Sequence, residues 1–105
     1  MKYRVIVQPP AELDIEAAYL YLRAHSQTHA ERWLTGIESA IESLASLPNR
    51  CGLARESREF SIEIRQLLFG KRSGRYRILF MVQDQEVRIL HVRHGARKEM
   101  SREEI

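Results

Sequence analysis

The last third of the chain falls into three short runs in which apolar and polar residues alternate. The runs are Ile62 to Phe69, Arg75 to Gln83 and Glu86 to His94. Alternation with a period of two is typical of a strand that buries one face, and the short connections favour an antiparallel meander. In the middle run one face would carry Tyr76, Ile78, Phe80 and Val82, and the other would carry Arg75, Arg77, Leu79 and Met81. The fold must therefore contain a small sheet with one apolar face and one partly basic face.

The beginning of the chain predicts one more strand and a helix. The strand covers Lys2 to Gln8 and ends at Pro9 and Pro10. Proline fits the first turn of a helix because its missing N–H has no partner to lose there. The helix is expected to run to about His25. Its apolar stripe would be formed by Leu13, Ala17, Leu20 and Ala24, with Tyr21 alongside.

A second helix follows after a short break. Thr28, with Glu31 three residues later, has the pattern of a capping box. The apolar stripe of this helix would comprise Trp33, Ile37, Ile41 and Leu44, widened by Ala40 and Leu47. Pro48 prevents the helix from continuing. Two helices with so short a connection predict an antiparallel hairpin.

The residues from Asn49 to Ser61 are polar and predict an irregular connection. The element order is then strand, helix, helix and three strands. This order predicts a single α+β domain over residues 1–105, with the helical hairpin packed on one face of a small, mostly antiparallel sheet. We expect the other face of the sheet to be partly open.

Basic charge is concentrated in the region of the predicted meander. Residues 62–98 carry nine Lys and Arg against three Asp and Glu, whereas the whole chain has a net charge of +3. A local basic patch indicates a docking surface for an anionic partner. Cys51 is the single cysteine and cannot form an internal disulfide, and no Cys or His cluster has the spacing of zinc ligands. We therefore expect no metal or cofactor.

The apolar runs of the chain are too short to cross a bilayer, and its first residues do not form the core of a signal peptide. These patterns predict a cytoplasmic protein that does not bind membranes.

Three segments together resemble the RelE/ParE superfamily of bacterial toxins from type II toxin-antitoxin, or plasmid stabilisation, systems. They are the strand opening Tyr76 to Phe80, the strand Val87 to Val92 and the closing run Arg93-His94-Gly95-Ala96-Arg97. The element order matches over nearly the whole chain, including the double proline before the first helix and the Trp-bearing second helix. The resemblance implies the same α+β fold and a cognate antitoxin, with which the chain would form a hetero-oligomer.

The superfamily has two branches with different targets. RelE-like members are ribosome-dependent mRNA endonucleases, and their chemistry needs a base, an acid and cations that stabilise charge on phosphate. The matching residues here would be Arg65, Arg77, His94 and Arg97. A second expected basic residue falls on Leu67, however, and an expected tyrosine falls on Glu103. Arg77 is shared by both branches, so a structural or antitoxin-contacting role is at least as consistent with it.

ParE-like members share the fold but inhibit DNA gyrase and lack that catalytic set, and the chain resembles this branch more closely. We therefore expect direct binding to gyrase, neutralised by the antitoxin, with no catalytic residue. The expected target-binding residues are Lys71, Arg72, Arg75, Arg93, His94, Arg97 and Lys98. The mRNA on the ribosome is the alternative target.

A non-toxic module that binds RNA is a third hypothesis, because aromatic residues on a basic sheet can stack bases. Phe80 and Tyr76 share the predicted core face, however, which leaves them unsuited to that role. We also expect Trp33 to lie in the core.

Overall fold

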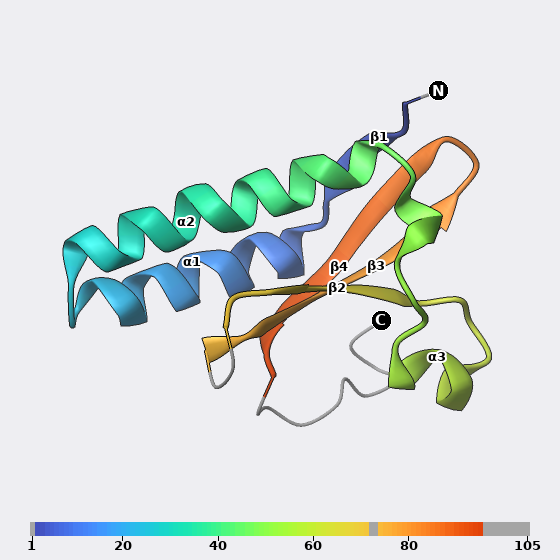
Figure 1. Cartoon of the computed structure of the whole chain (residues 1–105). Coiled ribbons are helices and arrows are strands. Elements are labelled where there is room, and N and C mark those ends of the chain that lie inside the picture. The colour runs from blue at the N-terminus through green and yellow to red at the C-terminus, as the bar shows by residue number, and fades with distance from the viewer. Residues whose placement is uncertain (1, 72–73, 96–105) are drawn as a thin grey trace.

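The computed structural model of the protein describes residues 2–71 and 74–95 (Figure 1). The helices and strands follow one another as β1 (Arg4–Val7), α1 (Pro9–Arg23), α2 (Gln27–Glu42), α3 (Arg55–Phe60), β2 (Arg65–Phe69), β3 (Tyr76–Gln83) and β4 (Glu86–His94). Two short 3-10 turns, Ser43–Ala45 and Pro48–Arg50, lie between α2 and α3.

The four strands of the described chain form one sheet in the order β1-β4-β3-β2. β1 is parallel to β4, and the pairs β3–β4 and β2–β3 are antiparallel. Figure 1 shows α1 and α2 lying side by side as a hairpin, with α3 away from them near β2. The structure thus confirms the predicted α+β class, the antiparallel meander and the hairpin on one sheet face.

The main core lies between the helical hairpin and the sheet. β3 and β4 contribute Ile78, Phe80, Val87 and Ile89, all fully buried. The predicted stripe of α2 packs against them, and Trp33 is 8% exposed. Leu47 is an exception to the prediction, because α2 ends at Glu42 and Leu47 has a φ of 48° and is 75% exposed.

The predicted apolar stripe of α1 is on the wrong side of the helix. Leu13, Leu20 and Tyr21 are 66%, 51% and 66% exposed, whereas the residues that pack on the core are Ala11, Ile15, Ala18, Tyr19 and Leu22. The helix therefore has apolar residues on two faces, and periodicity alone does not choose between them.

Asp14 selects the buried face of α1. β1 ends where Val7 pairs with Ile89, so the next part of β4 has no strand on that side. Oδ2 of Asp14 accepts a hydrogen bond from the backbone N–H of Val92 at 2.9 Å and lies 2.9 Å from Nδ1 of His91. The carboxylate thereby takes the place of a missing strand and holds one face of α1 against the edge of β4.

Several other predicted boundaries are wrong. Ser26, and not Thr28, caps α2, because its hydroxyl oxygen accepts a hydrogen bond from the backbone N–H of His29 at 3.2 Å. The segment from Asn49 to Ser61 is not wholly irregular, since it contains α3. The outer strands are also shorter than predicted, at Arg4–Val7 and Arg65–Phe69.

The role of Asp14 can be tested by replacing Asp14 with Ala. This change removes the acceptor for a backbone N–H that is shielded from water, and we expect it to lower the free energy of unfolding by about 1–3 kcal/mol. Urea denaturation followed by circular dichroism measures the change. Glu16→Ala on the same helix is the control, because Glu16 is exposed, and it should alter stability by at most about 0.5 kcal/mol. Equal effects of the two substitutions would contradict the role of Asp14.

Candidate functional site

Arg77, which the resemblance to the nuclease branch would place in a catalytic site, forms a buried ion pair that holds the fold together. Nη1 and Nη2 of Arg77 donate hydrogen bonds to the two carboxylate oxygens of Glu56 at 3.0 and 2.6 Å, and Nε donates to Oε1 of Gln66 at 3.0 Å. The side chains of Arg77 and Glu56 are only 5% and 0% exposed. Because a carboxylate already occupies the fork of the guanidinium, Arg77 cannot receive a phosphate without the loss of this ion pair.

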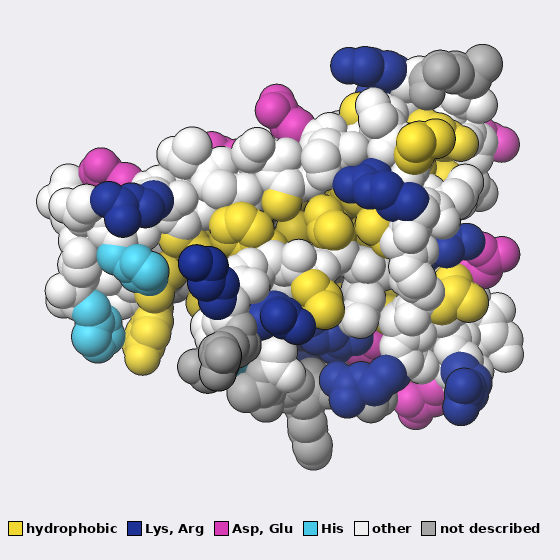
Figure 2. Space-filling view, in the orientation of Figure 1, with side chains coloured by type: hydrophobic (Ala, Val, Ile, Leu, Met, Phe, Trp, Pro, Cys, Tyr) yellow, Lys and Arg dark blue, Asp and Glu magenta, His cyan; other side chains and the backbone are white. Residues whose placement is uncertain are grey.

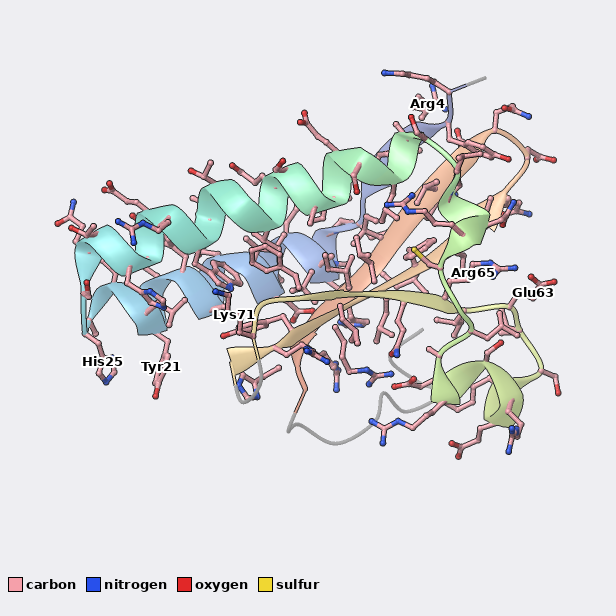
Figure 3. All side chains as sticks on the ribbon, viewed as in Figure 1. Arg4, Tyr21, His25, Glu63, Arg65 and Lys71 are labelled. Carbon is pink, nitrogen blue, oxygen red and sulfur yellow. The ribbon has the colours of Figure 1, made fainter. Side chains whose placement is uncertain are left out.

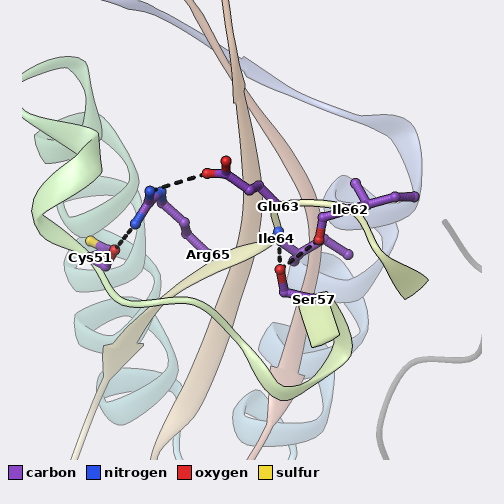
Figure 4. Close-up of polar contacts among 6 residues, drawn as sticks. All are labelled: Cys51, Ser57, Ile62, Glu63, Ile64 and Arg65. Carbon is purple, nitrogen blue, oxygen red and sulfur yellow. Dashed lines mark hydrogen bonds and ion pairs between the residues drawn. The ribbon is translucent and has the colours of Figure 1, made fainter. Parts of the chain in front are cut away.

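Helix α3 brings Glu56 to Arg77 and covers the second face of the sheet. Phe60 and Ala54 pack with Ile64 and Leu79 in a smaller core. Ser57 secures the end of the helix: its hydroxyl donates to the carbonyl oxygen of Ile62 at 2.6 Å and accepts from the backbone N–H of Ile64 at 3.2 Å (Figure 4). The sequence from Arg55 to Glu59 was predicted to be irregular because its charges look fully solvated, and nothing in their spacing marks Glu56 as buried.

Arg65, the first residue of β2, is held by two neighbouring groups. Its Nη1 donates to the carbonyl oxygen of Cys51 at 2.6 Å, and its Nη2 lies 3.3 Å from Oε1 of Glu63 (Figure 4). Arg65 pairs with Phe80 and therefore lies on the helical side of the sheet.

The structure does not bring Arg65, Arg77 and His94 together. His94 pairs with Tyr76, which neighbours Arg77 on the strand and so points to the opposite face. Along β3, the position of Arg65 is four residues from that of His94, which corresponds to about 13 Å. Arg97, the fourth member of the nuclease set, lies outside the described residues.

The predicted target-binding residues also occupy different environments. Lys71 and Arg75 are exposed on either side of the turn between β2 and β3, and His94 is half-buried. Arg93 is 4% exposed and shares the α3 side of the sheet with Arg77, its cross-strand partner. Arg72, Arg97 and Lys98 are not among the described residues.

Three aromatic rings form a row on the helical side of the sheet. The ring centroids of Trp33 and Tyr76 are 5.0 Å apart, and those of Tyr76 and His94 are 5.2 Å apart in an edge-on arrangement. Burial, assisted by the nearby Tyr21, raises the pKa of the Tyr76 hydroxyl above its usual value. Tyr76 therefore remains a neutral hydrogen-bonding group at physiological pH, and packs against the core as expected.

A groove of about 570 Å³ opens beside this row of rings, between the helical hairpin and the turn from β2 to β3. It is lined by Tyr21, Trp33, Phe69 and Tyr76, and also by Lys71. Figure 3 shows Tyr21 and His25 projecting from the hairpin, and Lys71 in the neighbouring turn. The groove has the size of a ligand or peptide site, and the sequence did not predict it because its walls come from five separate helices and strands.

In residues 2–71 and 74–95 there is no group of three or more His, Cys, Asp or Glu side chains that could hold a metal ion. Within the same residues, every helix is too short or too polar to cross a bilayer.

Comparison with known proteins identifies the family. The family model described as the ParE toxin of the type II toxin-antitoxin system, parDE, matches residues 5–99. The chain belongs to the ParE toxin family. Among solved structures, the chain resembles one titled as the chromosomal ParDE TA system from P. aeruginosa, with a TM-score of 0.69 and 20% identity over 89% of this chain and 96% of that chain. No curated protein matches the sequence.

Membership of the ParE family agrees with the fold described above. The resemblance to the RelE/ParE superfamily is confirmed, with the ParE-like branch as its nearer part. The fold of the P. aeruginosa structure is shared over nearly the whole length of both chains.

The buried ion pair predicts how this ParE-family chain responds to substitution at Glu56. Glu56→Ala leaves the Arg77 guanidinium in the interior without its carboxylate, and should lower the free energy of unfolding by about 3–5 kcal/mol. The double substitution Glu56→Leu with Arg77→Met removes both charges and should recover most of that loss. Urea denaturation measures both effects, with Glu59→Ala on the exposed side of α3 as the control. A double variant as unstable as Glu56→Ala would contradict the assignment.

The buried thiol of Cys51 should make the stability of the fold depend on pH. Burial raises the pKa of its thiol, although the nearby Arg50 and Arg65 act in the opposite direction. The thiol therefore keeps its proton to a higher pH in the folded state than in the unfolded state, where the pKa of a cysteine is about 8.5. The contribution of this group to the free energy of unfolding is complete below that pKa and declines as the pH rises above it. Iodoacetamide at pH 8 should react slowly with the native protein and rapidly in urea. Equal rates would contradict this, and Cys51→Ser should weaken the decline of stability above pH 8.5.

Proposed function

We propose that the protein is a toxin that arrests growth by binding DNA gyrase and performs no chemistry of its own. The observation that carries this proposal is the membership of the ParE toxin family over residues 5–99. The engagement of Arg77 by Glu56 and the separation of Arg65 from His94 also favour a binding function over RNA cleavage.

The proposed target-binding surface lies around the turn between β2 and β3. Lys71 and Arg75 are its exposed cations in the described part of the chain, and His94 lies on the neighbouring end of β4. Arg72, Arg97 and Lys98 complete the proposal, although they lie outside the described residues. We leave Arg93 out of the proposed target-binding surface because it is only 4% exposed.

A cognate antitoxin is the second proposed partner, and the two chains would form a hetero-oligomer in the cytoplasm. The solved structure that resembles the chain is titled as a ParDE TA system, which supports a partner of this kind. An antitoxin segment with apolar and acidic residues would suit the exposed apolar face of α1 and the basic turn, and it could fold as it binds.

Purified protein should inhibit the supercoiling of relaxed plasmid by gyrase, and its expression should induce the DNA damage response. Lys71→Glu and Arg75→Glu should each weaken inhibition about fivefold, since an exposed charge at an interface contributes roughly 1 kcal/mol. Arg58→Glu is the control, because Arg58 is exposed on α3 at the other face of the sheet.

Unchanged supercoiling and unchanged topoisomerase cleavage would refute the gyrase proposal. Cleavage of mRNA in a translation extract would instead favour the ribosome-dependent nuclease. Salt-sensitive binding to naked single-stranded RNA would favour the RNA-binding module.

A further inference from the structure

One edge of the sheet is only partly covered. β2 is the last strand in the order β1-β4-β3-β2, so one of its sides has no neighbouring strand among the described residues. The segment from Gly52 to Ala54 covers the beginning of that side. The N–H of Ala54 donates to the carbonyl oxygen of Ile64 at 2.7 Å, and the N–H of Gln66 donates to the carbonyl oxygen of Gly52 at 3.1 Å. The covering segment ends there, and the rest of β2 is open on this side.

The backbone of Leu68 is directed at the open side. In an antiparallel pair, successive residues of a strand direct their N–H and C=O groups to alternate sides. Since Gln66 bonds to the covering segment, Leu68 points the same way, whereas Leu67 and Phe69 bond to β3. Among the described residues, no backbone group outside the sheet bonds to the N–H or C=O of Leu68. An edge of this kind is a template for a further strand.

There is space for a further strand beside Leu68. The side chain of Leu68 lies on the α3 side of the sheet, opposite Arg77, and the residue is 45% exposed. A Cβ added at Gly52, or at Gly74 in the turn after β2, would meet no heavy atom within 4 Å. A strand added at this edge would therefore cover the exposed leucine as well as pair with its backbone.

The charges along this edge favour an acidic partner. Lys71 and Arg75 are exposed in the turn that follows β2. Glu63, just before β2, is already paired with Arg65 at 3.3 Å. On the face where Figure 1 shows β2, Figure 2 shows Lys and Arg side chains below a band of hydrophobic side chains. An extended segment that combines an apolar residue with acidic residues is complementary to this edge.

A second copy of the chain is less complementary. Arg65 and Lys71 lie three residues on either side of Leu68. If two β2 strands paired antiparallel about Leu68, Arg65 of each copy would lie opposite Lys71 of the other. Like charges at directly opposite positions destabilise a pair of strands. The charges therefore favour a strand from a different protein.

We infer that gyrase adds a strand to the open edge of β2. An extended acidic segment of gyrase pairs with the N–H and C=O of Leu68, places an apolar side chain beside that of Leu68 and directs a carboxylate at Lys71 and Arg75. This inference rests on the proposed inhibition of gyrase. It extends the proposed target-binding surface from the turn onto β2, and it identifies the backbone of Leu68 as a contact.

Proline at position 68 tests the backbone contact. Leu68→Pro removes the N–H at the open side and spares the hydrogen bonds to β3, and edge strands tolerate proline at such positions. The toxin concentration that half-inhibits supercoiling should rise about thirtyfold, because a carbonyl group of gyrase loses its donor. Leu68→Val keeps the N–H and loses one methylene, so that concentration should rise at most about fourfold.

Leu53→Pro is the matched control. Leu53 is 56% exposed, and its neighbours Gly52 and Ala54 make the hydrogen bonds to β2, so its own N–H is directed away from that strand. The variant should inhibit gyrase as the unsubstituted chain does. Urea denaturation followed by circular dichroism establishes that each variant is folded.

Hydrogen exchange gives a second readout that needs no substitution. In the free toxin the N–H of Leu68 should exchange rapidly, and in the complex with gyrase it should exchange slowly, because it gains an acceptor. Mass spectrometry of a peptide that contains residues 66–71 measures the difference. A peptide from α2 is the reference, and its exchange should not change.

The outcomes separate the two proposals. If the toxin inhibits gyrase, but Leu68→Pro inhibits as well as Leu68→Val and the exchange of β2 is unchanged, the edge is not the contact while the gyrase proposal remains. If the unsubstituted chain does not affect gyrase, both proposals are refuted. Loss of antitoxin binding by Leu68→Pro, with inhibition unchanged, would assign the edge to the antitoxin.

A toxin dimer that Leu68→Pro dissociates, again with inhibition unchanged, would assign the edge to a second copy of the chain. Sedimentation velocity measures this outcome. Should Leu68→Pro fail to fold, the hydrogen exchange of the unsubstituted toxin still decides the question.

Discussion

The ion pair between Arg77 and Glu56 is the contact on which the second face of the sheet depends. A guanidinium near the start of a central strand cannot be buried alone, because an unpaired charge in the interior costs several kcal/mol. Glu56 meets it with both oxygens, and this draws α3 across β3. Phe60 can then cover Leu79 in the smaller core. The sheet is consequently packed on both sides, and the face that looked open and basic is largely closed.

This closure changes where the protein can meet a partner. Arg77 and Arg93 are buried on the α3 side of the sheet, whereas Lys71 and Arg75 are exposed at the turn between β2 and β3. On the helical side, the contact between Asp14 and β4 holds α1 in a rotation that leaves Leu20 and Tyr21 in solvent. Charge and apolar surface thus meet at the end of the hairpin, beside the groove that Trp33, Phe69 and Tyr76 line.

Much of the fold follows from local patterns. The alternation in β3 and β4 and the stripe of α2 each reflect burial of one face, and the order of the residues predicts such a face. The order did not predict the buried face of α1, because apolar residues occupy both sides of that helix. Helix α3 was missed because its six residues are mostly charged and show no apolar stripe. The sequence did not predict the groove either, since its walls come from α1, α2, β2, β3 and β4.

The sequence by itself determined the order of the four strands and the two long helices, the meander, the core stripe around Trp33 and the resemblance to the RelE/ParE superfamily. Each of these depends on residues that are close together in the chain. Only the tertiary structure decided that Arg77 faces Glu56, that His94 lies on the other side of the sheet and that a groove opens beside Trp33. The physical reason is that hydrogen bonding and charge pairing depend on distances between residues 20 or more positions apart, as with Arg77 and Glu56. Periodicity carries no information on those distances.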